Sequence, residues 1–325
     1  MNLESATERK GQAKKYYTKM SVCPNDRPAF SFEFYQKHIK DKNTEYTFKC
    51  LKCGKEFKSK QNRAMHSSCP YCNSNNNKSF KLEVVDYLKS INPNLNIIVD
   101  AERIVPKQTI DIYIPEKRLA IDCDELNMHS YECFDVTKAN KNYHVDKTDM
   151  CEAIGLQLVH IFGDEWEEQK EICKSRLANL IGIYKKTIYA RKCKIRELIG
   201  KEAREFLVRN HNQGYSCSSV NVALEYEGKI VSIMTFCKSR FSKKHEWEVL
   251  RFCSELNYHV VGAASKIFKY FVKEYKPNNV ISYADRRWSI GKLYRSIGFN
   301  CIDISKPAYW YIDREKNHRY NRVLF

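Results

Sequence analysis

Acidic, histidine and lysine residues gather at the ends of apolar stretches within residues 111–166. The segment contains DIYIPEKRLAIDCDELNMH and, after a short interval, YHVDKTDMCEAIGLQLVHIFGDEW. The side chains that could do chemistry are Asp111, Asp122, Asp124, His129, His144 and Lys147. Carboxylates at strand ends beside histidine and lysine are what metal-dependent cleavage of a phosphodiester requires.

Each of these residues has a predicted task. Asp111 opens one apolar strand and Asp122 ends the next, so antiparallel pairing brings both carboxylates to one end of a sheet. Asp124 lies on the same face as Asp122 if the strand continues. Carboxylate oxygens and the substrate phosphate are the ligands that Mg²⁺ prefers. His129 could accept a proton from the attacking water, and Lys147 could offset charge on the phosphorane.

Each residue also has a simpler interpretation. An aspartate at a strand end is often a turn former, His129 and His144 could cap surface loops, and Lys147 could be a solvated helix lysine. The combination favours catalysis, because LAIDCD is an apolar strand that ends abruptly in acids beside histidines, at a cost in stability.

Regular elements must position these residues. Apolar periodicity predicts a helix from about 79 to 91, where Asn92-Pro93 ends it. A hairpin-like turn, Pro115-Glu116-Lys117, joins the second and third predicted strands. The remaining predicted elements of this part are strands at 96–99, 109–114 and 118–123, a helix over 143–154, the buried strand LQLVHIF, and a helix from about 165 to 181.

Two cysteine pairs precede this part. Cys50-x-x-Cys53 and Cys69-x-x-Cys72 have fifteen residues between them. Each pair can present two thiolates to one cation, and two pairs complete a tetrahedral zinc site. Four thiolates leave no open position, so we expect a structural zinc ion. The ten other cysteines are scattered, and most read as small core residues.

Charge is segregated along the chain, which has 325 residues and a formal net charge of +17. Residues 1–80 hold 16 Lys and Arg against 7 Asp and Glu, residues 81–186 hold 14 against 19, and residues 187–325 hold 26 against 13. An acidic middle segment between two basic segments favours a metal site in the middle, with the basic segments binding a polyanion. The alternative is an ordinary basic protein with solvated lysines.

Membrane and secretory classes do not fit the sequence. No apolar run reaches the roughly 18–20 residues that span a bilayer, and the N-terminus has no apolar signal core. We therefore expect a cytoplasmic protein without a membrane partner.

The chain from 79 to 186 resembles the phage-encoded homing endonucleases of the EDxHD class, which share a PD-(D/E)xK restriction-like core with the very-short-patch repair endonuclease. The resemblance rests on DIYIP, LAIDCDE, MHS and YHVDKTDMCEAIGLQLVHIFGDEW in that order. Relatives commonly have glutamate where this chain has Asp122. The shorter aspartate side chain retracts the carboxylate by about one carbon–carbon bond. The resemblance implies Glu83 as the acid of the first helix, Asp111 as the central metal ligand, and Asp122 as the second strand position near the metal. It also implies His129 as the catalytic histidine, and His144 and Lys147 as members of the cluster on the following helix.

Residues from about 190 onward resemble the GNAT acetyltransferase fold in their predicted order of elements. The loop from His259 to Ser265 looks like that fold's pyrophosphate loop, although the usual Arg or Gln is His259 here. The charge of this part favours DNA contact over acetyl-CoA, which is not the expected partner. Alternatively, Trp288, Tyr294 and Phe299 are core and the arginines a solvated face. The predicted DNA-binding residues are Arg286, Arg287, Trp288, Arg314, Arg319 and Arg322.

We therefore expect an α+β multidomain protein. A basic arm with a four-cysteine zinc ribbon spans 1–78, a restriction-endonuclease-like α/β core spans 79–186, and a GNAT-like, DNA-contacting α/β domain spans 187–325. The predicted function is Mg²⁺-dependent, site-directed cleavage of double-stranded DNA by a phage homing endonuclease, in the cytoplasm of the bacterial host. The alternatives are a DNA-binding regulator with a degenerate nuclease core, and an acetyltransferase fused to a nucleic-acid-binding module.

Overall fold

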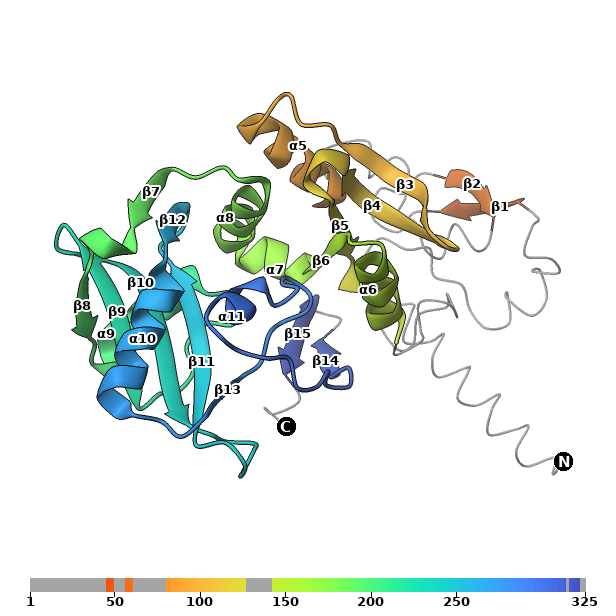
Figure 1. Cartoon of the computed structure of the whole chain (residues 1–325). Helices are drawn as coiled ribbons and strands as arrows, with labels where there is room; N and C mark the ends of the chain where they lie inside the picture. The colour runs from red at the N-terminus through yellow and green to blue at the C-terminus, as the bar shows by residue number, and fades with distance from the viewer. Residues whose placement is uncertain (1–44, 50–55, 61–79, 127–141, 314–315, 322–325) are drawn as a thin grey trace, which may run out of the picture. The chain divides into compact units, whose positions relative to one another are not determined.

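The structure is a computed structural model that describes residues 45–49, 56–60, 80–126, 142–313 and 316–321. The chain divides into two compact units, Met1–Ser79 and Phe80–Phe325. Helices and strands are mixed (Figure 1), which confirms the α+β class. Within the described ranges, no helix has the length and apolar character needed to cross a membrane.

The first unit contains one described pair of strands. β1 (Glu45–Lys49) pairs antiparallel with β2 (Glu56–Lys60), with Lys49 opposite Glu56. In the sequence, Cys50 and Cys53 fall between these strands. All four predicted zinc ligands, Cys50, Cys53, Cys69 and Cys72, lie outside the described residues, so the zinc site stays a prediction.

A four-stranded sheet forms the first half of the second unit. Its strands are β3 (Ile98–Val105), β4 (Gln108–Ile114), β5 (Leu119–Asp124) and β6 (Gln157–Phe162), in that order. The first three are antiparallel, whereas β6 runs parallel to β5. The parallel connection contains α6 (Tyr143–Ala153), and α5 (Phe80–Ile91) precedes the sheet.

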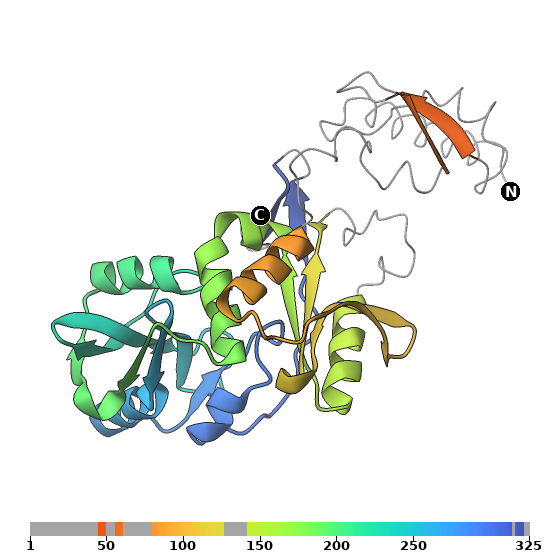
Figure 2. The ribbon, with the colours of Figure 1, turned by 90° about the horizontal axis from the view of Figure 1, so that it is seen from above.

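Every residue of β5 is buried, because helices cover both faces of the sheet. Ile121 belongs to a core formed with Val84 and Leu88 of α5 and with α8 (Lys170–Ile181). Ala120 belongs to a second core, formed with Cys151 of α6. Neighbouring strand residues therefore face opposite layers, as the pleat requires. Figure 2 shows α5 and α8 on one side of the sheet and α6 on the other.

The predicted helix over about 165–181 is two helices in the structure. α7 (Gly163–Glu168) ends at Gln169, whose backbone leaves the helical region at φ −125° and ψ 33°, and α8 follows directly. The predicted hairpin turn is confirmed as a single 3₁₀ turn over Pro115–Lys117, which Arg118 ends in the left-handed conformation.

The second half of the unit is built on a five-stranded sheet in the order β13-β11-β10-β9-β8. These strands are β8 (Lys194–Glu197), β9 (Val220–Tyr226), β10 (Lys229–Lys238), β11 (Trp247–Ser254) and β13 (Val280–Ser282). All neighbours are antiparallel except β11 and β13, which are parallel.

Helices cover both faces of this second sheet as well. Phe271 of α10 (Ala263–Tyr275) stacks on Phe236 at 3.7 Å between ring centroids. Phe206 of α9 (Gly200–Asn210) packs on the opposite face, in a cluster with Ala223 and Ile233.

Short elements complete the second unit. β7 (Lys186–Tyr189) pairs parallel with β12 (Tyr258–Val261). A 3₁₀ turn spans Ala190–Lys192, and α11 spans Lys292–Ser296. The hairpin of β14 (Trp310–Asp313) and β15 (His318–Asn321) comes last.

Candidate active site

The polar residues of the first sheet lie at the carboxyl ends of β5 and β6. Asp122 lies opposite His160 and Asp124 opposite Phe162 in the parallel ladder. Alternation places the side chains of Asp122 and His160 on the face that α6 covers. Asp122, Asp124 and His160 are each at most 2% exposed.

β4 and β5 separate at this end of the sheet. Their last paired residues are Ile112 and Ile121. Beyond that point, the backbone N–H of Cys123 donates to Asp111 Oδ2 at 2.9 Å, and the N–H of Asp111 lies 3.4 Å from Asp122 Oδ1. The two carboxylates thus accept from backbone groups that the ladder no longer pairs, which fixes both at the opening between the strands.

Lys147 of α6 forms a buried ion pair with Asp122. Its Nζ lies 2.5 Å from Asp122 Oδ2 and donates to the carbonyl of Thr109 at 2.7 Å. Burial raises the pKa of the Asp122 carboxyl, although the charges of Lys147 and His160 act to lower it. Burial tends to lower the pKa of Lys147, but the charge and hydrogen bond of Asp122 raise it overall.

A second set of contacts surrounds Asp124. Its Oδ2 lies 3.0 Å from His160 Nδ1 and 3.6 Å from His144 Nδ1. His160 Nε2 lies 3.1 Å from the hydroxyl of Thr148, which donates to the carbonyl of His144. Burial tends to lower the pKa of His160, but the charge and hydrogen bond of Asp124, together with the charge of Asp122, raise it overall.

Three of these residues form a group that could hold a cation. One ligand atom each from Asp124, His144 and His160 lies within 4.8 Å of the other two. Two imidazoles and one carboxylate are typical of transition-metal sites, whereas Mg²⁺ favours an all-oxygen shell. Asp111 and Asp122 supply such oxygens beside the group, although Asp122 is paired with Lys147.

The first helix contributes a different residue from the one expected. Lys81 of α5 lies 3.4 Å from Asp111 Oδ1 and 2.5 Å from Asp100 Oδ1. Glu83 instead accepts from Trp166 Nε1 at 2.9 Å and from Lys170 at 2.6 Å. These hydrogen bonds from Lys170 and Trp166 lower the pKa of Glu83. The structure therefore places Glu83 at the junction of α5 with α7 and α8.

The predicted residues Asp111, Asp122, Asp124, His144 and Lys147 do come together, while His129 lies outside the described residues. Sequence reasoning missed His160, Thr148 and Lys81. The signal for His160 was present, because a histidine inside the apolar run LQLVHIF is a buried polar group that needs a partner.

The structure gives internal partners to four of the predicted DNA-binding residues. Arg286 pairs with Asp149 and Glu152 at 2.6 and 2.8 Å. Trp288 is 3% exposed and belongs to the core beneath the first sheet. The carbonyl of Arg287 accepts from the N–H of His160 at 3.0 Å, so this segment lies along β6 instead of extending β13.

Arg319 of β15 forms the other internal contact. Its Nε lies 3.0 and 2.9 Å from the two oxygens of Asp164, and its guanidinium lies 3.8 Å from the Phe162 ring centroid. Arg287 and Arg319 both reach Glu165 Oε1, at 2.7 and 3.2 Å. Both arginines therefore join the C-terminal half to α7. Arg314 and Arg322 are outside the described residues.

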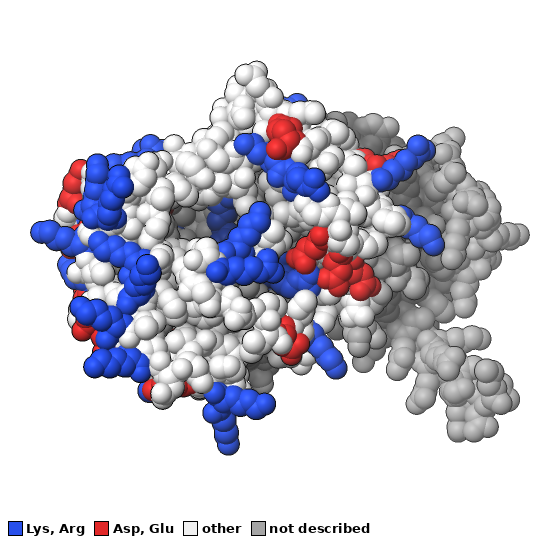
Figure 3. Space-filling view, viewed as in Figure 1, with Lys and Arg blue, Asp and Glu red and all other residues white. Residues whose placement is uncertain are grey.

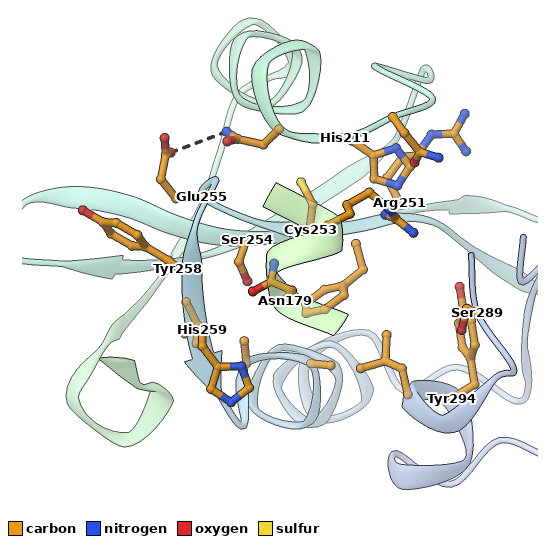
Figure 4. Close-up of a pocket in the computed structure, with 18 of the residues that line it drawn as sticks. Asn179, His211, Arg251, Cys253, Ser254, Glu255, Tyr258, His259, Ser289 and Tyr294 are labelled. Carbon is orange, nitrogen blue, oxygen red and sulfur yellow. Dashed lines mark hydrogen bonds between the residues drawn. The ribbon is translucent and has the colours of Figure 1, made fainter. Parts of the chain in front are cut away.

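A cavity of about 560 Å³ lies in the second half of the unit. Side chains from α8, the end of α9, β11 and β12 face it (Figure 4), among them Asn179, His211, Arg251 and His259. None of the residues that line this cavity belongs to the cluster around Asp122 and Asp124.

A scan with protein-family models and a search of curated protein sequences both found no match to the chain.

Proposed function

We propose that the protein is a divalent-metal-dependent endonuclease acting on double-stranded DNA, with its catalytic centre where β4 and β5 separate. The observation that carries this proposal is the convergence of Asp111, Asp122 and Asp124 with Lys147 and His160 at one end of a buried sheet. Two buried carboxylates, Asp122 and Asp124, beside the partly exposed Asp111 are costly. That cost is understandable where a cation and a phosphate must be bound.

A divalent cation fits the donors of this centre. Asp111, with a side chain 30% exposed, and Asp124 would hold Mg²⁺ together with Asp122, if Lys147 moves toward the substrate. His144 adds a nitrogen ligand that would favour Mn²⁺ over Mg²⁺, whereas both ring nitrogens of His160 are engaged by Asp124 and Thr148. A bound cation would polarise the scissile phosphate and lower the pKa of the attacking water.

The remaining residues have roles that follow from their contacts. Lys147 holds a positive charge beside Asp122 and would stabilise negative charge as it develops on the phosphate. Asp124 orients His160 through Nδ1, and Thr148 engages the other nitrogen. His129 remains the proposed proton acceptor, since it follows β5 by five residues.

The charge of the chain supports DNA as the polyanion. Lys and Arg side chains stand in several groups on the C-terminal half, and Asp and Glu are fewer, on the face shown in Figure 3. Residues 187–325 carry twice as many basic as acidic side chains. Such a surface binds phosphates without reading sequence. We propose that the cysteine-rich first unit adds a zinc ribbon and, with it, contacts to the target site.

Plasmid and phage DNA cleavage tests the proposal. Wild-type protein should cut with Mg²⁺ or Mn²⁺ and not with EDTA, and Asp111→Ala should lower the rate at least about a hundred-fold. Glu171→Ala, at a side chain 70% exposed on α8, is the matched control and should cut normally. Undiminished cutting by Asp111→Ala would remove the proposed centre.

The same samples distinguish the alternatives. A DNA-binding regulator with a degenerate core would retain DNA and cut under no divalent metal. The zinc ribbon has its own measurement: about one zinc per chain is expected, and Cys50→Ser should lose it.

Acetyl transfer is favoured by one observation, since the amino end of α10 with Gly262 lines the cavity. Saturable binding of acetyl-CoA, lost in Gly262→Val, would support that alternative.

A further inference from the structure

The cavity of the C-terminal half contains two arginines that lack an acidic partner. Arg176 of α8 lies with its guanidinium carbon 4.5 Å from the centroid of the Trp288 ring, and its buried Nε has no hydrogen-bond partner. Asp285 also lines the cavity, but Arg287 occupies its carboxylate with contacts of 2.9 and 3.2 Å. Arg176 forms no ion pair with a described carboxylate.

Arg251 of β11 is in a similar position. It donates from Nε to the carbonyl of Gly214 at 3.2 Å and from Nη1 to the carbonyl of Leu250 at 2.9 Å. These backbone contacts fix the guanidinium but do not neutralise it, and it too has no ion pair with a carboxylate of the described ranges. Burial lowers the pKa of both arginines, and the charges of Arg287 and Arg240 act in the same direction.

His211, at the end of α9, completes this side of the cavity. Its Nδ1 accepts from the N–H of Gln213 at 3.0 Å, so the proton of the neutral ring is on Nε2. Burial and the charges of Arg251 and Arg176 lower the pKa of His211 to about 3. His211 and Arg251 lie side by side in Figure 4, and Arg176, which also lines the cavity, is close enough for its charge to act on His211.

We propose that this arginine-lined end of the cavity binds the anionic group of a small molecule, a carboxylate or a phosphate attached to an apolar body. Guanidinium groups bind both anions through paired N–H donors. Apolar walls are supplied by Phe252, Val260, Leu293 and Ile297. A volume of about 560 Å³ is in the range of small-molecule sites. An anion here would neutralise two partly buried charges that have no ion pair with a described carboxylate.

Binding of matched fragments to the full chain tests this inference. Phenyl phosphate and benzoate share a ring and differ in the anionic group, and benzyl alcohol is the neutral control. Ligand-observed NMR should show saturable binding of one or both anions and none of the alcohol. Arg176→Gln and Arg251→Gln should each weaken binding about ten-fold or more. Arg209→Gln, an arginine of α9 with a side chain 64% exposed, should leave binding unchanged.

A second measurement needs no variant. An anion beside His211 favours its protonated form, so saturating phenyl phosphate or benzoate should raise the pKa of His211 in an NMR titration. Equal binding of benzyl alcohol, absence of binding by both anions, or unchanged binding by both arginine variants would overturn the inference. It would also be overturned if the variants weakened DNA binding but not fragment binding, because the arginines would then serve the polyanion.

Discussion

At the residue scale, the centre depends on buried charges that neutralise one another. Lys147 and Asp122 have side chains that are each 3% exposed, with 2.5 Å between Nζ and Oδ2. Such a pair adds little net stability, but removal of one partner leaves an unpaired buried charge. The same reasoning applies to His160, whose two ring nitrogens contact Asp124 and Thr148.

Lys147→Met should therefore destabilise the protein by about 3–5 kcal/mol, because Asp122 loses its counter-charge. Urea denaturation gives the free energy of unfolding. Lys170→Met is the control, since its pair with Glu83 is 41% and 37% exposed, and it should cost less than about 1 kcal/mol. Equal losses in both variants would contradict the assignment of Lys147 to a buried pair.

His211 predicts a specific dependence of stability on pH. Its pKa in the folded chain is about 3, against 6.5 for the free side chain. The unfolded chain therefore binds more protons between these values, and stability falls as pH falls through this window. From about pH 7 to about pH 5, the wild type should lose about 1–2 kcal/mol more than His211→Gln. Parallel losses in denaturant titrations would show that His211 is not kept neutral by the fold.

At the element scale, α7 connects the two halves of the second unit. Asp164 is 5% exposed and accepts from the side chain and the backbone N–H of Arg319. Arg287 also reaches α7, at Glu165. A six-residue helix has little intrinsic stability, so these contacts hold it between β6 and α8.

Arg319→Ala should cost about 3–5 kcal/mol, since it leaves Asp164 buried without a cation. The neighbouring His318→Ala removes a contact with Glu168, whose side chain is 53% exposed, and should cost about 1 kcal/mol or less. Adding Asp164→Ala to Arg319→Ala should recover part of the loss in thermal denaturation. If the double variant is less stable than the single one, Arg319 acts through packing and not through charge.

At the scale of the whole molecule, Trp288 connects the two halves of the second unit. This side chain, 3% exposed, belongs to the hydrophobic core that also contains Val84 of α5 and Ile121 of β5. The backbone beside it accepts from His160, and the side chain of Gln157 donates to the carbonyl of Trp288. The second half therefore contributes Trp288 to the core of the first sheet, while the second sheet has its own clusters of buried residues.

Trp288→Ala should lower the free energy of unfolding by about 3–5 kcal/mol, through the cavity it leaves. Because the tryptophan joins both halves, the wild type should unfold in a single transition in calorimetry and in circular dichroism. Trp310→Ala, at a side chain 44% exposed on β14, is the matched control. Two separate transitions in the wild type would show that the halves unfold independently.

Local sequence determined most elements of the fold. The apolar stretches IDIYI and LAIDC predicted β4 and β5, and the periodic apolar residues predicted α5, because backbone geometry links spacing to exposure. The same alternation predicted that Asp111 and Asp122 meet at one end of the sheet. For Glu83 the sequence predicted the helix that carries it but not the partners of its side chain. Those partners depend on how the helix packs against Trp166 and Lys170.

The partners of the charged residues were decided only by the tertiary structure. Nothing in the segment around Arg286, Arg287 and Trp288 shows that it leaves β13 and lies along β6, where the arginines meet acids and the tryptophan enters the core. An exposed basic segment and a buried ion-paired one have the same composition, since pairing depends on which distant carboxylates the fold brings near. The same holds for His160, which met Asp124 through a parallel ladder between residues 36 positions apart. Sequence thus determined the kinds of groups present, and long-range packing determined which of them are neutralised.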